Sequence, residues 1–68
     1  MLENGDVRIK LKETDRFGNH VIMNFEGVNC IIGNDVPFIW IQKSNGTATF
    51  IAHDAVLSLA FTPAGAEA

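Results

Sequence analysis

The stretch PFIWIQKSNGTATFIA, residues 37–52, decides the fold because it predicts two β-strands joined by a turn at Asn45-Gly46. Asparagine and glycine tolerate the positive φ angles of a type I′ turn better than other residues do. The residues on either side are mostly β-branched or aromatic, and such side chains suit the pleated surface of a sheet. The sequence therefore predicts a β-hairpin centred on a type I′ turn.

The first strand of this hairpin is apolar on both faces. Two aromatic side chains alternate with two isoleucines, and successive residues of a strand point to opposite sides of the sheet. A strand with one solvated face would carry polar residues on that face, so both faces of this strand need a cover. In a chain of 68 residues we expect a second copy of the chain to supply one cover. The predicted oligomer interface consists of Phe38, Ile39, Trp40 and Ile41.

The size of the chain also favours self-assembly. A domain of 68 residues is close to the size at which a single core barely offsets the conformational entropy of folding. Cys30 is the only cysteine, so no disulfide within the chain can add stability. The cysteine and the two histidines also lack the spacing of a structural zinc site. We expect no metal and no cofactor, and we expect oligomerisation to supply the missing stability.

Periodicity outside the hairpin predicts further short strands. Residues 7–13 alternate between apolar and charged side chains, which indicates a strand with one buried face. A second strand is expected from His20, with a bulge or sharp bend at Gly27 and a short strand over residues 28–32. A turn at residues 33–35 then leads into the hairpin.

The segment after the hairpin completes the predicted fold. Residues 53–55 are expected to form a tight 3₁₀ turn before the last strand. Short strands with turns every 8 to 12 residues predict an all-β fold, a small and strongly bent antiparallel barrel of five or six strands. Residues 1–62 are expected to form this single domain, and residues 63–68 a disordered tail. The core-facing residues predicted in the last strand are Leu57, Leu59 and Phe61.

Four of the five basic residues lie near the N-terminus, and three of them share one face of the first strand. Arg8, Lys10 and Lys12 would stand about 6.5–7 Å apart, a spacing at which a row of cations can follow a phosphate backbone. The alternative is that these side chains protect an edge strand against edge-to-edge aggregation. The net charge of −3 argues weakly against a nucleic-acid binder, whose surface is usually basic.

Phe17 is the aromatic residue that we expect to be most exposed, because it lies in the turn Arg16-Phe17-Gly18-Asn19. An exposed aromatic ring can stack on the base of a single-stranded nucleic acid. Trp40 and the other phenylalanines occur among alternating apolar residues, so we expect them in the core or in a subunit interface.

Groups that could carry out catalysis are few. The chain has no tyrosine, and Cys30 alternates with apolar residues, which predicts a small buried side chain and not a nucleophile. His53 and Asp54 are adjacent, and adjacent residues of a strand point to opposite faces. We therefore expect the protein not to be an enzyme.

The expected location is the cytoplasm, with no membrane partner. No apolar run approaches the roughly 20 residues of a membrane-spanning helix. The N-terminal residues lack both the positive charge and the apolar core of a signal peptide.

The C-terminal half combines an apolar strand at 39–42, a turn at 44–46, a strand at 49–51 and the segment 52–56, with looser matches at Gly27, Asp35 and Phe38. This pattern resembles the Sm-like family of small RNA-binding barrels. It implies a barrel of the Sm-like or SH3-like type whose final strand pairs with the neighbouring subunit of a ring. It also implies that His53 and Asp54 line the central pore and contact uridines or adenines.

These features together predict a non-catalytic, homo-oligomeric binding module, with single-stranded RNA as the leading ligand by resemblance. The alternative is a structural or protein-interaction subunit, for example of a phage or mobile element, that binds a protein partner by strand addition. The acidic net charge favours this alternative, whereas the basic row and the His53-Asp54 turn favour RNA. The predicted RNA-binding residues are His53, Asp54, Arg8, Lys10, Lys12 and Phe17.

Overall fold

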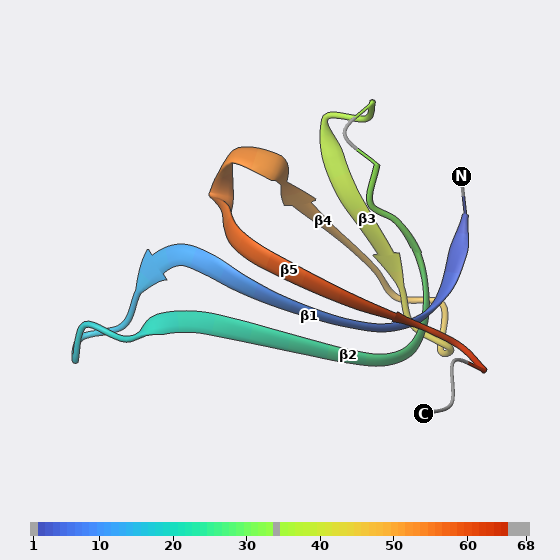
Figure 1. Cartoon of the computed structure of the whole chain (residues 1–68), viewed down its shortest axis with the longest axis horizontal. Coiled ribbons are helices and arrows are strands. Elements are labelled where there is room, and N and C mark those ends of the chain that lie inside the picture. The colour runs from blue at the N-terminus through green and yellow to red at the C-terminus, as the bar shows by residue number, and fades with distance from the viewer. Residues whose placement is uncertain (1, 34, 66–68) are drawn as a thin grey trace.

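The computed structural model describes residues 2–33 and 35–65, and these residues form one antiparallel five-stranded sheet (Figure 1). The strand order across the sheet is β4-β3-β2-β1-β5, so the first two strands lie in its middle. The all-β prediction is confirmed. The elements are β1 (Glu3–Thr14), β2 (His20–Ile31), β3 (Phe38–Gln42), β4 (Ala48–Ala52), the 3₁₀ turn η1 (His53–Ala55) and β5 (Val56–Pro63).

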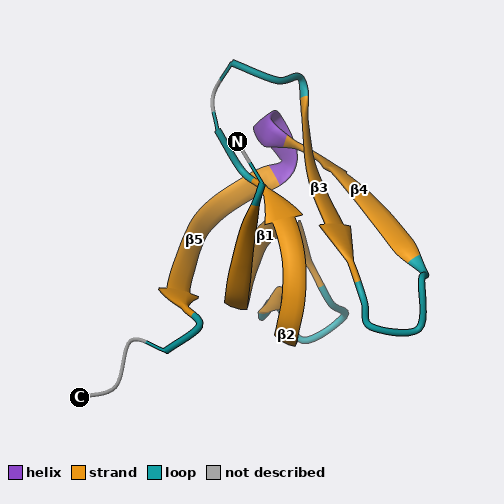
Figure 2. Cartoon of the chain, turned by 90° about the vertical axis from the view of Figure 1, so that its right-hand side faces the viewer, coloured by secondary structure: helices purple, strands orange, loops and turns teal. Residues whose placement is uncertain are grey.

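The sheet is strongly bent but does not close within the described residues. The hairpin of β3 and β4 turns away from the half that contains β5, β1 and β2 (Figure 2). Among the described residues, three cross-strand pairs connect the two halves within the sheet: Asn29–Ile31 of β2 pair with Trp40–Gln42 of β3. The predicted barrel is therefore an open bent sheet in the single chain, and β4 and β5 are its two free edges.

The core lies on the concave side of the bent sheet. Alternate residues of β1 and β3 point into it, as the sequence periodicity predicts. Partly buried side chains from β1, β2 and β5 pack around it, including Leu59 and Phe61. The buried hydrophobic residues are Val7, Ile9, Phe25, Val28, Cys30, Ile39, Ile41 and Ile51.

A β-bulge at Gly27 bends β2, as predicted. The inward positions of β2 change there from Phe25 to Val28, and the register with β1 shifts opposite Asp6. Gly27 has a φ of +62° and donates its backbone N–H to Asp6 Oδ1 at 2.9 Å. The bulge does not break the strand, so β2 continues to Ile31 where two separate strands were predicted.

The turn of the β3–β4 hairpin differs from the predicted type I′ turn. Among the described residues only glycines have positive φ, so Asn45 does not adopt the left-handed conformation. Gly46, with a φ of +91°, donates to the Lys43 carbonyl at 2.9 Å, and Lys43 donates to the Thr47 carbonyl at 2.8 Å. This is a three-residue loop in which a tight turn precedes a left-handed glycine. The prediction was wrong because the register of the strands leaves an odd number of residues in the loop.

The last strand is longer and less regular than predicted. Ser58 and Ala60 are exposed as expected, but Leu57 is also exposed because the pairing of β5 with β1 shifts next to it. Pro63 still belongs to the strand, although the tail was expected to begin there. The next residue, Ala64, donates its N–H to the Asn4 carbonyl at 2.9 Å. The rest of the predicted tail (residues 66–68) and Asn34 of the predicted 33–35 turn lie outside the described residues.

Candidate nucleic-acid interface

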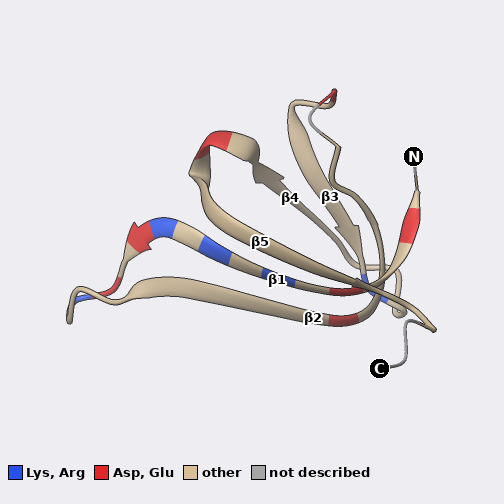
Figure 3. Ribbon diagram, viewed as in Figure 1, with Lys and Arg blue, Asp and Glu red and all other residues tan. Residues whose placement is uncertain are grey.

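The three cations of the predicted row lie on the outer face of β1 (Figure 3). Arg8, Lys10 and Lys12 are exposed, whereas Val7 before them and Ile9 between the first two point into the core. The alternation of the sequence thus places the row as expected. We refer to these three cations as the basic row.

The cross-strand neighbours of Arg8 and Lys10 are uncharged and mostly small. A shallow hollow of about 240 Å³ lies between these two cations and their neighbours. Toward the bulge, Arg8 also borders a second hollow that includes the carboxylates of Asp6 and Glu26. The positive charge is therefore less opposed at Lys10 than at Arg8. The neighbours are Asn24 and Ile22 on β2, and Ala60 and Ser58 on β5.

The alternative explanation of the basic row, protection of an edge strand, does not fit the topology at Arg8 and Lys10. There β1 is hydrogen-bonded to β2 on one side and to β5 on the other, so it has no free edge that another chain could pair with. Lys12 lies one residue beyond the last pairing with β5, so edge protection still applies to it. The error arose because alternation along a strand shows its buried face but not its place in the sheet.

Phe17 lies at the tip of the hairpin that joins β1 and β2, and it is 74% exposed, as predicted. The Asp15 carboxylate accepts hydrogen bonds from the backbone N–H groups of Phe17 at 2.8 Å and Asn19 at 3.0 Å. Gly18, with a φ of +84°, donates to the Asp15 carbonyl at 3.0 Å. The guanidinium carbon of Arg16 lies 5.0 Å from the centroid of the Phe17 ring. The tip therefore presents an aromatic ring on a well-hydrogen-bonded loop.

His53 and Asp54 occupy the predicted 3₁₀ turn, which connects the two free edge strands. Asp54 is exposed, whereas His53 is half-buried and its Nε2 atom has no hydrogen-bond partner among the described residues. His53 borders an open hollow of about 410 Å³ whose other lining residues include the core residue Ile39. This hollow shares only Ser58 with the hollow beside Arg8 and Lys10, so the structure does not bring these two sets of predicted residues together.

The predicted interface strand divides between core and surface. Ile39 and Ile41 are almost fully buried in the chain's own core, whereas Phe38 is 50% exposed on the opposite face. Trp40 lies on that outer face opposite Phe50, which is 66% exposed. We call Phe38, Trp40 and Phe50 the aromatic patch. Phe50 was missing from the predicted interface, although its alternation with the buried Ile51 was a signal that could have placed it there.

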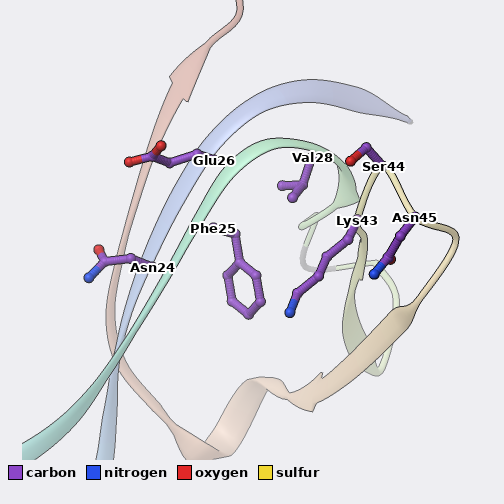
Figure 4. Close-up of a pocket in the computed structure, with 7 residues that line it drawn as sticks. All are labelled: Asn24, Phe25, Glu26, Val28, Lys43, Ser44 and Asn45. Atoms are coloured by element: carbon purple, nitrogen blue, oxygen red, sulfur yellow. The ribbon is translucent and has the colours of Figure 1, made fainter.

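Lys43, the one basic residue outside the N-terminal cluster, belongs to a different hollow (Figure 4). Its ammonium nitrogen lies 6.0 Å from the centroid of the Phe25 ring. The hollow has a volume of about 230 Å³ and lies between β2 near its bulge and the β3–β4 loop. It combines one cation, one carboxylate and two side-chain amides, so no single ligand charge is favoured. Its lining residues are Asn24, Phe25, Glu26, Val28, Lys43, Ser44 and Asn45.

Cys30 is fully buried, as predicted, and is therefore poorly placed to act as a nucleophile. Burial raises the pKa of its thiol, and the nearby charge of Glu3 raises it further, so the reactive thiolate is disfavoured. Within residues 2–33 and 35–65, no group of three or more histidine, cysteine or acidic side chains could hold a metal ion. The same residues contain no helix long and apolar enough to cross a membrane.

Comparisons with known proteins return no relatives. No family model matches the chain, no curated protein matches it, and no solved structure matches it.

Proposed function

We propose that this protein is a non-catalytic binding module that assembles with copies of itself and binds single-stranded RNA along the outer face of β1. One observation carries the proposal: the basic row stands on an internal strand, and the residues directly opposite its first two cations are uncharged. Cations that are not neutralised across the strands remain available to phosphates.

The spacing of the row suits a nucleic-acid backbone. Alternate residues of a regular strand are about 6.5–7 Å apart, so Arg8 and Lys10 can meet successive phosphates of an extended strand. Lys12 follows beyond a shift in the register of β1 and continues the row toward the hairpin tip. Phe17 lies on the hairpin beyond the row and offers a ring to an unpaired base. The resemblance to the Sm-like family adds His53 and Asp54, of which Asp54 is the exposed one. RNA is the ligand that best accounts for this combination.

The two free edges of the sheet support self-assembly. A sheet that bends without closing can be completed by pairing β4 of one copy with β5 of the next, which removes both edges from solvent. Phe50 on β4 and the small residues Ser58 and Ala60 on β5 are all exposed, so such a pairing has room for the large ring beside small side chains. In the Sm-like family the final strand pairs with a neighbouring subunit, so this arrangement agrees with the resemblance.

A salt series of RNA binding tests the proposal. For three phosphate contacts on one subunit, the affinity for a single-stranded oligonucleotide should fall with salt with a log–log slope of about −2. Replacing Arg8, Lys10 and Lys12 together by Gln should abolish this slope and leave the fold intact, because all three side chains are exposed. Lys10→Gln and Lys43→Gln form a matched pair, in which only the first should reduce the slope, by about 0.7. A wild-type affinity weaker than about 0.1 mM at low salt, too weak for the typical range of even non-specific binding, would refute RNA binding.

The second candidate function is that of a structural or protein-interaction subunit, and the aromatic patch favours it. Large exposed aromatic side chains beside a free strand edge are typical of protein contacts. Under this alternative the patch and the edge of β4 bind a different protein, and the basic row has no ligand. If the wild-type protein assembles with copies of itself but shows no measurable RNA binding, this alternative is the better account.

A further inference from the structure

Residues 12–21 form an arm that projects from the sheet (Figure 1). The pairing of β5 with β1 ends at Leu11, and the pairing of β3 with β2 involves only residues from Asn29 onward. The two strands of the arm therefore pair only with each other. All of the arm is exposed except Val21, which is half-buried. An isolated two-stranded ribbon has little stability of its own in water, so a long exposed one is best explained by a contact that it makes.

The arm and the base of its first strand carry a charge opposite to that of the rest of the protein. Residues 8–21 contain four basic and two acidic side chains, which leaves a formal charge of +2. The other residues contain one lysine and six acidic side chains, which leaves −5 and accounts for the total of −3. A polyanion is therefore repelled by most of the molecule and attracted by this segment, so the field directs it to the arm.

The loop at the tip holds an aromatic ring in a defined position. Phe17 is the most exposed large apolar side chain among the described residues, and the hydrogen bonds from its backbone and from Asn19 to Asp15 hold the loop. Arg16 stands over the same ring, 5.0 Å from its centroid. An exposed ring beside a guanidinium is the combination that binds the face of an unpaired base, through stacking and cation–π attraction.

We infer that this arm is the RNA-contacting element of the protein, and that Phe17 stacks on an unpaired base at the end of the phosphate path formed by Lys10 and Lys12. The inference rests on the proposed RNA-binding function and adds to it the position and the type of contact. It requires a single-stranded ligand, because in a duplex the faces of the bases are covered by their neighbours. Duplex RNA of the same length should therefore bind at least several-fold more weakly.

The test measures affinity and stacking separately. The probe is a single-stranded oligouridine of about ten nucleotides with one 2-aminopurine, whose fluorescence is quenched when it stacks. Phe17→Leu keeps an apolar side chain but removes the ring, and it should weaken binding about 5- to 150-fold, the range of a lost base–aromatic stack. The 2-aminopurine quenching should disappear and the salt slope should stay the same. Phe17→Trp should retain both affinity and quenching.

Leu2→Ala is the control, because Leu2 is also a large, exposed apolar side chain but belongs to neither the arm nor the aromatic patch, and it should leave affinity and quenching unchanged. If the wild type binds with the expected salt slope but Phe17→Leu binds equally well, the stacking inference is overturned and the proposed function stands. Equal affinity for duplex RNA, or a change of native mass in Phe17→Leu in place of a change of affinity, would also overturn it. If the wild type binds no RNA, both the inference and the proposed function fail.

Discussion

The β1–β2 hairpin and the β3–β4 hairpin end in the same kind of loop, but their outer faces differ in chemistry. In each loop a glycine of positive φ, Gly18 or Gly46, follows a tight turn, and the flanking residues share a backbone hydrogen bond of 2.8 Å. The outer face of the first hairpin carries the basic row, whereas the outer face of the second carries the aromatic patch. The loop is thus a local solution for connecting two strands, and it does not determine what the hairpin binds. The outer side chains determine this, since cations favour phosphates and aromatic rings favour bases or other proteins.

The largest expected effect is on the free energy of unfolding, which should depend strongly on the core of the second hairpin and little on the tip of the first. Ile41→Ala should lower the free energy of unfolding by about 2–5 kcal/mol, because Ile41 is fully buried and its loss leaves a cavity. Phe17→Ala should change it by less than about 0.5 kcal/mol, because the ring is exposed. Urea unfolding followed by the fluorescence of Trp40, the only tryptophan, measures both. A large loss for Phe17→Ala would mean that the tip is packed against a partner.

The second effect concerns assembly and should distinguish the two outer faces. Phe50→Lys should reduce the native mass to that of the single chain at micromolar concentration, because it would bury an unpaired charge in the proposed contact. Phe17→Lys should leave the native mass unchanged. If the wild type is itself a single chain at this concentration, the aromatic patch is not a contact between copies. The two hairpins would then not differ in their role in assembly.

A smaller effect tests whether the two loops are equivalent. Gly18→Ala and Gly46→Ala should each destabilise the fold by about 1–2 kcal/mol, the cost of a left-handed conformation for a residue with a Cβ atom. An added Cβ would meet no atom within 4 Å at either position, so only the backbone conformation is tested. Thermal unfolding of both variants should give similar losses. A clear difference between them would show that one loop is held by contacts that the other lacks.

The smallest effect is a pH dependence at Cys30, which lies on β2 opposite Ile41 of β3, where the two hairpins join. Burial raises the pKa of this thiol in the folded chain. Above about pH 8.5 the thiol of the unfolded chain loses its proton while the folded chain keeps it. The unfolded state then binds fewer protons, so the free energy of unfolding falls as pH rises from this value toward the raised pKa. Cys30→Ala should reduce this fall relative to the wild type, and an unchanged pH profile would contradict it.

Much of the first hairpin could be predicted from local patterns, and less of the second. Alternation alone placed the basic row on the outer face of β1, and the turn residues around Phe17 predicted its exposure. The bulge at Gly27 followed from a glycine at the point where the apolar alternation changes phase. In the second hairpin, Asn45-Gly46 marked the turn correctly but suggested the wrong type, because turn type depends on the register of the paired strands.

The sequence by itself determined the all-β class, the positions of the turns and the inward face of each strand that alternates between apolar and polar residues. Only the tertiary structure decided which face of β3 is the inner one, because both faces are apolar and the choice depends on where the sheet bends. It also decided that β1 is internal and that residues 12–21 project beyond their neighbours. Those features depend on which strands pair and how far each pairing extends. Pairing links residues far apart in the chain, which a local pattern cannot show.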